Sequence, residues 1–288
     1  MKKILITGAN SYVGMSFENW LSQWPDRYHV DTIDMIDGSW REKSFAGYDV
    51  VFHVAGIAHV SADPAKKDLY YKINRDLAVQ TAEKAKSDGV KQFIFMSSMI
   101  VYGADEPVGR VKIITKDTKP APADFYGDSK LQADLAIQAM ADDNFTVSIM
   151  RPPVIYGPGC KGNFPKLLKL AKYAFLFPDI ENRRSMIYID NFAECVRLAI
   201  DEARGGIFFP QNEDYVATKD VIAKYRRTKG KTTFVVPAPV FVCKMLSGSR
   251  LFNKAFGSKI YAKELSDCER YSVTDFQTGI ARMLRNAR

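Results

Sequence analysis

The 288-residue sequence predicts an α/β protein built on a doubly wound parallel sheet. Three observations predict this fold class. Short apolar runs alternate with helical patterns over the first 155 residues. The run DVVFHVAG at 49–56 is almost continuously apolar, as expected for a strand buried on both faces of a parallel sheet. The turn TGANSYVG at 7–14 joins the first strand to the first helix and has the glycine spacing of a phosphate-binding loop.

The elements follow in a regular order up to about residue 155, after which the rhythm changes. Strands are predicted over 2–8, 29–34, 49–56, 91–98 and 146–152, with helices over 9–24, 73–89 and 129–143. Later elements are a helix at 164–174, a strand end and helix at 187–203, and a strand at 205–211. We therefore expect a cofactor-binding domain over 1–155 and a smaller substrate-binding lobe over 156–288, from which segments can return to the first sheet.

Composition excludes several classes of protein. Hydrophobic residues make up 47% of the chain and charged residues 26%, as in ordinary globular proteins, and no apolar run is long enough to cross a bilayer. The opening MKKILITG has an apolar stretch of only three residues, so it reads as a strand rather than a signal peptide, and a cytoplasmic location is expected. The four cysteines lie far apart without CxxC spacing, so neither a disulfide framework nor a metal site is expected.

The net charge of +8 is concentrated toward the C-terminus. Residues 219–270 hold 12 Lys or Arg and 4 Asp or Glu. Such a surface can attract nucleic acid, anionic lipid or a phosphorylated small molecule, or can simply be solvated. No nucleic-acid motif accompanies it, so we expect no nucleic-acid partner. Residues 240–263 mix aromatics with cations, and we favour a substrate lid there over a peripheral contact with a membrane.

The turn at 7–14 predicts a dinucleotide site. Gly8 and Gly14 occupy the outer positions of a G-x-x-G-x-x-G pattern, and Ser11 takes the middle position, where its hydroxyl can touch phosphate. An acidic residue about 20 positions further on is expected to accept from the ribose hydroxyls of NAD. Asp34 has this spacing and Asp37 is its rival, while loop capping is the alternative role for both. A carboxylate there repels the 2′-phosphate of NADP, so NAD is favoured.

Tyr126 and Lys130 stand four positions apart in YGDSK, which places both side chains on one face of a helix. A free phenol has a pKa of about 10, too high for efficient proton exchange at neutral pH. A nearby ammonium favours the phenolate and is expected to lower that pKa. The pair therefore predicts a phenol that moves a proton, against the alternative of an ordinary surface pair.

Five motifs in this order make the chain resemble the extended short-chain dehydrogenase/reductase family, the NAD-dependent epimerase/dehydratases: TGANSYVG, DVVFHVAG, FIFMSSMIVYG, YGDSK and RPPVIYGPG. The resemblance covers essentially the whole chain and implies a Rossmann-type fold. It assigns catalysis to Ser98, in preference to Ser97, with Tyr126 and Lys130. It also extends the expected NAD site, beyond the residues above, to Tyr12, Val13, Ala55, Gly56, Tyr126, Lys130 and Pro153.

The second half resembles enzymes that act on UDP-sugars, most closely those of bacterial capsule and O-antigen synthesis. The resemblance implies that Asn163 and Arg184 contact the sugar nucleotide, with Arg183 as an alternative to Arg184. Many sugar epimerases carry an asparagine where this chain has Val154. We prefer a UDP-4-keto-6-deoxy-HexNAc 4-reductase, with a UDP-glucose or UDP-N-acetylglucosamine 4-epimerase that retains NAD as the alternative. A dehydratase is disfavoured because Met99 and Ile100 follow Ser98.

A non-catalytic NAD- or RNA-binding protein on the same fold is the alternative from a different class. The Tyr126–Lys130 pair argues for an enzyme, because non-catalytic relatives commonly lack it. Members of the family often dimerise through a four-helix bundle, so a homodimer is expected, with residues 73–86 and 129–140 supplying the helices.

Overall fold

A computed structural model describes residues 1–58, 63–238, 245 and 248–285. The chain divides into two compact units. The first unit comprises 1–103, 119–152 and 192–210, and the second comprises 104–118, 153–191 and 211–288. Residues 104–118, placed in the first domain by the sequence prediction, thus lie in the second unit. Residues 192–210 return to the first.

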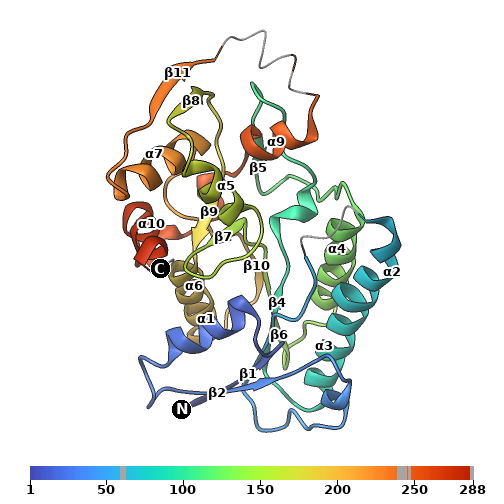
Figure 1. The fold of residues 1–288 in the computed structure, drawn as a ribbon. Coiled ribbons are helices and arrows are strands. Elements are labelled where there is room, and N and C mark those ends of the chain that lie inside the picture. Colours follow the sequence, from blue (N-terminus) through green and yellow to red (C-terminus); the bar gives the residue numbers. More distant parts are fainter. Residues whose placement is uncertain (59–62, 239–244, 246–247, 286–288) are drawn as a thin grey trace. The chain divides into compact units, whose positions relative to one another are not determined.

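The first unit is built on a six-stranded sheet in which every pairing is parallel (Figure 1). The strand order is β10-β6-β4-β3-β1-β2. The strands are β1 (Lys2–Thr7), β2 (Tyr28–Ile33), β3 (Val50–His53), β4 (Gln92–Met96), β6 (Thr146–Met150) and β10 (Gly206–Phe208). The order reverses direction between β1 and β3, which makes this point the switch of a doubly wound sheet. The predicted fold class is confirmed.

Helices cover both faces of this sheet (Figure 1). One layer holds α2 (Lys67–Tyr70), the π-helical segment η3 (Tyr71–Leu77), α3 (Ala78–Ser87) and α4 (Phe125–Gln138). The other holds α1 (Tyr12–Leu21) and α6 (Ile189–Asp201), of which residues 192–201 belong to this unit. Short 3₁₀ turns are η1 (Ser39–Arg41), η2 (Pro64–Lys66) and η4 (Met99–Tyr102).

Small residues let the first helical layer approach the sheet closely. Ala78, Ala82 and Ala85 of α3 and Ala133 of α4 are fully buried in one hydrophobic cluster. They pack in a core with the large sheet residues Val51, Phe93, Phe95, Val147 and Ile149. Close packing of this kind fixes the helix that carries Tyr126 and Lys130 against the strands.

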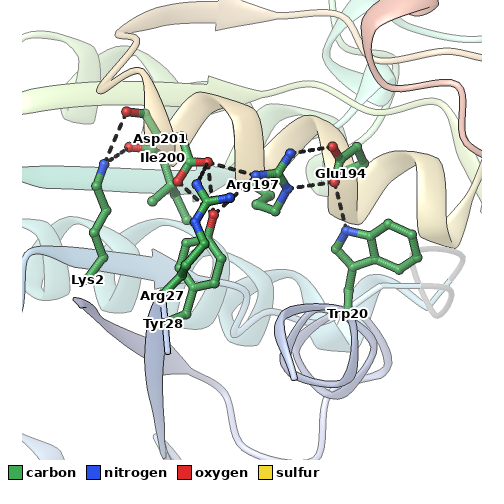
Figure 2. Close-up of polar contacts among 8 residues, drawn as sticks. All are labelled: Lys2, Trp20, Arg27, Tyr28, Glu194, Arg197, Ile200 and Asp201. Atoms are coloured by element: carbon green, nitrogen blue, oxygen red, sulfur yellow. Dashed lines mark hydrogen bonds and ion pairs between the residues drawn. The ribbon is translucent and has the colours of Figure 1, made fainter. Parts of the chain in front are cut away.

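A polar network fastens α6 to α1, which lies in the same layer, and to the edge strands β1 and β2 (Figure 2). Arg197 of α6 pairs with Glu194 at 2.6 Å and with Asp201 at 2.7 Å. Trp20 of α1 donates to Glu194 at 2.9 Å, and the Tyr28 hydroxyl donates to Asp201 at 2.7 Å. Arg27 and Lys2 add bonds to the last turn of α6. Residues far apart in sequence are thereby tied into one layer.

The second unit contains short parallel strand pairs and four helices among its described residues. The pairs are β11 (Phe234–Pro237) with β8 (Leu176–Asp179), β12 (Lys259–Tyr261) with β5 (Lys112–Ile114), and β7 (Val154–Tyr156) with β9 (Met186–Tyr188). The helices are α5 (Asn163–Ala171), α7 (Thr218–Thr228), α9 (Arg250–Phe256) and α10 (Phe276–Arg285), with 3₁₀ turns η5 (Lys263–Leu265) and η6 (Cys268–Arg270).

The core of this unit is aromatic. The Tyr156 ring stacks on Phe164 at 5.1 Å and meets Tyr188 edge-on at 5.4 Å. The buried Asn212 side chain donates to the Tyr156 hydroxyl at 2.9 Å and accepts from the Tyr188 backbone at 3.1 Å.

Along the part of the chain that is described, no helix combines the length and apolar character needed to span a bilayer.

Candidate active site

The predicted site residues of the first unit gather at the carboxyl edge of the sheet. Gly8 follows β1, Ala55 and Gly56 follow β3, and Ser98 follows β4. This edge, beside the switch point between β1 and β3, is where ligands of doubly wound folds bind.

The turn after β1 is shaped by two glycines. Gly8 adopts φ +98°, and a Cβ there would lie 2.9 Å from the Ala55 backbone. Gly14 lies buried in α1, and a Cβ there would lie 3.1 Å from the Ile6 side chain. The first glycine therefore permits the tight turn, and the second permits close packing of helix on strand. These are the roles that a dinucleotide-binding turn requires.

Ser11 caps α1 in addition to occupying the middle position of the motif. Its hydroxyl oxygen accepts from the Gly14 N–H at 3.1 Å, so the O–H is left to donate toward a phosphate. Tyr12 and Val13 are the first two residues of α1, where the helix dipole favours an anion. These residues fit the pyrophosphate of a dinucleotide.

The two candidate ribose carboxylates both form local turns. Asp34, exposed directly after β2, accepts from the Ile36 N–H at 2.8 Å. Asp37 accepts from the Ser39 hydroxyl at 2.8 Å and its N–H at 3.0 Å, and these bonds lower the pKa of Asp37. Loop capping, the alternative role considered for each, is thus present in both. The position of Asp34 at the end of the strand beside β1 suits a ribose contact.

The structure brings Ser98, Tyr126 and Lys130 together. Tyr126 is the second residue of α4, and Asp124 caps this helix by accepting from the Gly127 N–H at 2.9 Å. The Ser98 side chain interacts with the Tyr126 hydroxyl and favours its phenolate form. Lys130, one turn further along α4, donates to the Met96 carbonyl at 2.8 Å. A phenol, a hydroxyl and an ammonium thus converge at the ends of α4 and β4.

Burial controls the protonation of this group. Desolvation raises the pKa of Tyr126 to about 12, although the interaction with Ser98 opposes the rise. Desolvation also lowers the pKa of Lys130 to about 8, against the opposing charge of Asp134. The expectation that Lys130 acidifies the phenol is therefore wrong for the protein alone. The lysine is itself driven toward neutrality, and its head group is directed to Met96.

Asn74 belongs to this region and was missed by the sequence analysis. It is fully buried in η3, where its amide accepts from the Ile57 N–H at 2.9 Å and donates to the Ile57 carbonyl at 3.0 Å. A Cβ on Gly56 would lie 3.0 Å from Asn74 Oδ1 and 3.2 Å from Lys130 Nζ. Asn74 therefore holds the segment after β3 against Lys130. Its π-helical setting, often found at functional sites, leaves no simple signal in the apolar periodicity.

The neighbouring Ser97 has a different environment from Ser98. Its hydroxyl donates to Asp134 at 2.6 Å, inside a network that is almost completely buried. Arg151 binds both oxygens of Asp134, at 2.8 and 2.9 Å, and donates to the Tyr102 hydroxyl at 2.7 Å. This network joins α4 to both ends of the segment that carries Ser98, so it fixes the spacing between Ser98 and α4.

The remaining predicted residues lie in the second unit. Asn163 is exposed at the start of α5, and Pro153 is buried at the start of the unit. The Arg184 guanidinium pairs with Asp105 at 3.1 Å and donates to the Gly257 carbonyl at 2.9 Å, while burial lowers the pKa of Arg184. The side chain of Arg183 is exposed. Arg184 thus anchors the end of α9, and Arg183 is the more accessible of the two candidates.

The basic segment 240–263 is described only in part, since 239–244 and 246–247 lie outside the described residues. In β12, Lys259 is buried and pairs with Asp105 at 3.1 Å. Ile260 and Tyr261 are also buried, so this end of the segment packs inward.

Comparison with known proteins identifies the family. Residues 4–216 match the model of the NAD dependent epimerase/dehydratase family. A UDP-glucose 4-epimerase of Vibrio cholerae is 32% identical over 279 residues, covering 89% of this chain and 83% of that enzyme. The N-acetyl-alpha-D-glucosaminyl-diphospho-ditrans,octacis-undecaprenol 4-epimerase of Escherichia coli O157:H7 is 30% identical over 221 residues, covering 70% of this chain and 64% of that enzyme.

Solved structures share the fold. A UDP-glucuronic acid 4-epimerase from Bacillus cereus in complex with NAD superposes with a TM-score of 0.73 at 20% identity, covering 99% of this chain and 96% of that one. A dTDP-4-dehydrorhamnose reductase from Bacillus anthracis in complex with NADP gives a TM-score of 0.74 at 17% identity, with all of both chains covered. With the family model spanning most of the sequence, the chain belongs to the NAD dependent epimerase/dehydratase family, as its five motifs predicted.

Proposed function

We propose that this chain catalyses NAD-dependent oxidoreduction at C4 of a UDP-linked sugar, with the first unit holding NAD and the second holding the sugar nucleotide. The interaction of Ser98 with the Tyr126 hydroxyl, with Lys130 one turn further along α4, is the observation that carries the proposal. The similarity to a UDP-glucose 4-epimerase over 89% of the chain supports the choice of substrate class.

NAD, when bound, accepts or supplies the hydride that leaves or reaches C4. The turn at 7–14, an acidic side chain after β2, Gly56 and Lys130 are the groups proposed to hold it. Ser98 and Tyr126 act on the oxygen of C4. Since the pKa of Tyr126 lies at about 12, its hydroxyl is protonated at neutral pH and can donate to that oxygen as the hydride reaches the carbon. The products of that step are an alcohol, the oxidised nicotinamide and a phenolate, which solvent reprotonates.

Reduction of a UDP-4-keto-6-deoxy-HexNAc is the first candidate reaction, because the raised pKa of Tyr126 prepares the proton donor that reduction requires. A 4-epimerase is the second, because three relatives at 30% identity or more are described as 4-epimerases. In that reaction Tyr126 must begin as the phenolate, which takes the proton of the C4 hydroxyl in the first half and returns it in the second. For the sugar nucleotide we propose Asn163 with Arg183 or Arg184, of which Arg183 is exposed.

Two incubations distinguish the candidates. A reductase consumes NADH or NADPH when a UDP-4-keto sugar is supplied. The loss of absorbance of the reduced nicotinamide measures this reaction. An epimerase converts UDP-GlcNAc or UDP-galactose into its C4 epimer without added cofactor. Chromatography of the two sugar nucleotides measures this reaction. Failure of both reactions with a protein that still binds NAD would refute C4 chemistry. Stabilisation by RNA that displaces UDP would favour the non-catalytic alternative.

The assignment of Tyr126 is tested by Tyr126→Phe. Loss of the phenolic hydroxyl should reduce kcat at least 10²-fold, the lower end for a general acid or base, while NAD affinity changes little. Tyr48→Phe is the matched control, because it removes a phenolic hydroxyl that binds Asp31 elsewhere in the first unit. Wild-type turnover in Tyr126→Phe would overturn the assignment.

A homodimer through η3, α3 and α4 remains part of the proposal. Leu135 of α4 is 55% exposed, as expected of an apolar residue that a helix of the partner subunit would cover. Sedimentation of wild type and Leu135→Glu should give a dimer and a monomer, respectively, and a monomeric wild type would contradict this arrangement.

A further inference from the structure

The second unit exposes a cluster of large apolar side chains at the end of α5 and on the β8–β11 pair. Tyr173 is 84% exposed, and Leu170, Phe175, Leu176 and Phe234 are each more than half exposed. We refer to these five side chains as the aromatic face. Exposed apolar residues are common singly, but a cluster of this kind marks an interaction site.

Four of the five side chains are close in sequence, and the pairing of β11 with β8 brings Phe234 beside them. Phe234 of β11 lies opposite Leu176 of β8, and its N–H donates to the Phe175 carbonyl at 2.8 Å. The rings of Phe175 and Phe234 meet edge-on at 5.1 Å. The turn after α5 adds Tyr173, whose N–H donates to the Leu170 carbonyl at 3.1 Å. Figure 1 shows β8 and β11 side by side above α7.

A buried arginine builds the support beneath this face. Arg226 of α7 donates to the carbonyls of Ala171 and Lys172 at 3.3 and 3.0 Å, and to the Thr232 carbonyl at 2.9 Å. One guanidinium therefore ties the turn that presents Tyr173 to the segment that leads into Phe234. The aromatic face is therefore fixed by the fold, because the turn after α5 and the segment before β11 are both bound by Arg226.

The segments that carry the aromatic face are rich in cations, and the acidic residue at the end of β8, Asp179, is paired with Lys219 at 2.6 Å. Segments 166–176 and 227–235 contain no Asp or Glu. They contain six cations, all exposed: Lys166, Lys169, Lys172, Arg227, Lys229 and Lys231. Exposed aromatic rings on segments rich in cations match the boundary of an anionic bilayer, where rings enter the headgroup region and each cation contributes about 1 kcal/mol.

We propose that the aromatic face docks the enzyme peripherally on an anionic membrane surface. The inference goes beyond the proposed C4 chemistry and uses residues outside the basic segment 240–263. A second copy of the chain is a poorer occupant, because a two-fold contact through this face would bring the same six cations together. Anionic phospholipid headgroups neutralise those cations while the rings enter the interface.

Vesicle binding tests the proposal on the full chain. We expect the protein to co-sediment with phosphatidylcholine vesicles containing phosphatidylglycerol at low salt, to be released at about 0.5 M salt, and to stay in solution with phosphatidylcholine alone. Lys172→Glu with Lys231→Glu should weaken binding at least 25-fold, because each lost cation is worth about fivefold. Tyr173→Ser with Leu176→Ser should weaken it about tenfold or more.

Matched controls separate this face from general charge and apolar exposure. Ile113→Ser removes a residue of the same unit that is 53% exposed, and Lys116→Glu reverses an exposed charge there, so both should bind vesicles as wild type does. Equal weakening by the control variants, or no binding to anionic vesicles at low salt, would overturn the proposal. The proposal would also be overturned if the wild-type protein were a dimer that did not bind vesicles and the substitutions in the aromatic face abolished that dimer. Since the assay needs no substrate, its failure leaves the proposed C4 chemistry untouched.

Discussion

Replacing Lys130 by methionine should make the protein more stable while removing its activity. Lys130 is 6% exposed, and burial lowers its pKa from 10.5 to about 8. That depression corresponds to a cost of roughly 3 kcal/mol for keeping the ammonium charged in the folded protein at neutral pH. Methionine removes the charge and leaves the Met96 carbonyl without its donor, a loss of about 1 kcal/mol. The net expectation at pH 7 is a gain of about 2 kcal/mol.

The pH dependence follows from the direction of this shift. The positive charge on Lys130 destabilises the folded protein relative to the unfolded chain, because the pKa of Lys130 in the fold lies below its ordinary value. The cost is fully present below about pH 8 and fades as the pH rises toward 10.5, since the unfolded chain holds more protons in that window. The advantage of Lys130→Met over wild type should therefore shrink by about 2 kcal/mol between pH 7 and pH 10.

Urea unfolding of both proteins at the two pH values measures this difference. Lys91→Met, at an exposed position of the same unit, is the control and should change stability by less than about 0.5 kcal/mol at either pH. The reasoning would be refuted if the Lys130→Met protein were less stable than wild type at pH 7. It would also be refuted if the difference in stability between the two proteins did not change with pH. Activity should be lost in Lys130→Met and kept in Lys91→Met.

Two further predictions concern the support of the site. Asp134→Asn leaves the buried Arg151 charge without its partner and should cost about 3–5 kcal/mol in urea unfolding; a loss below about 1 kcal/mol would contradict the burial of this pair. Gly8→Ala, with a Cβ 2.9 Å from the Ala55 backbone, should weaken NAD binding and cost more stability than Gly47→Ala. Gly47 also has positive φ but has nothing within 4 Å, so equal effects of the two variants would remove the steric argument.

The sequence predicted the strands of the first unit closely, because most of them are short apolar runs that end in a glycine, a serine or a proline. The expected strand at 91–98 is observed as β4 over Gln92–Met96, and that at 205–211 as β10 over Gly206–Phe208. The helix expected at 129–143 begins earlier, at Phe125, because Asp124 supplies the cap. Local patterns of this kind depend only on neighbouring residues, so they can be read without the fold.

Features that depend on distant residues could not be read in this way. The pKa of Tyr126 is set by burial, which the spacing to Lys130 does not reveal. Asn74 reaches its position through a π-helical turn and a contact 17 residues away at Ile57. Arg184 looked like a free fork for a diphosphate, but its guanidinium is bound by Asp105 and by the Gly257 carbonyl, 73 residues further along.

The network around Arg197 has a consequence for the order in which the protein is made. Trp20 and Tyr28 emerge early from the ribosome, but their partners Glu194 and Asp201 follow 174 and 173 residues later. β10 emerges later still. The first unit therefore cannot complete its sheet until residues 153–191 of the second unit have been synthesised. A nascent chain that stalls before α6 would present an open strand edge and an uncovered apolar layer, which is the form most exposed to aggregation and to chaperones.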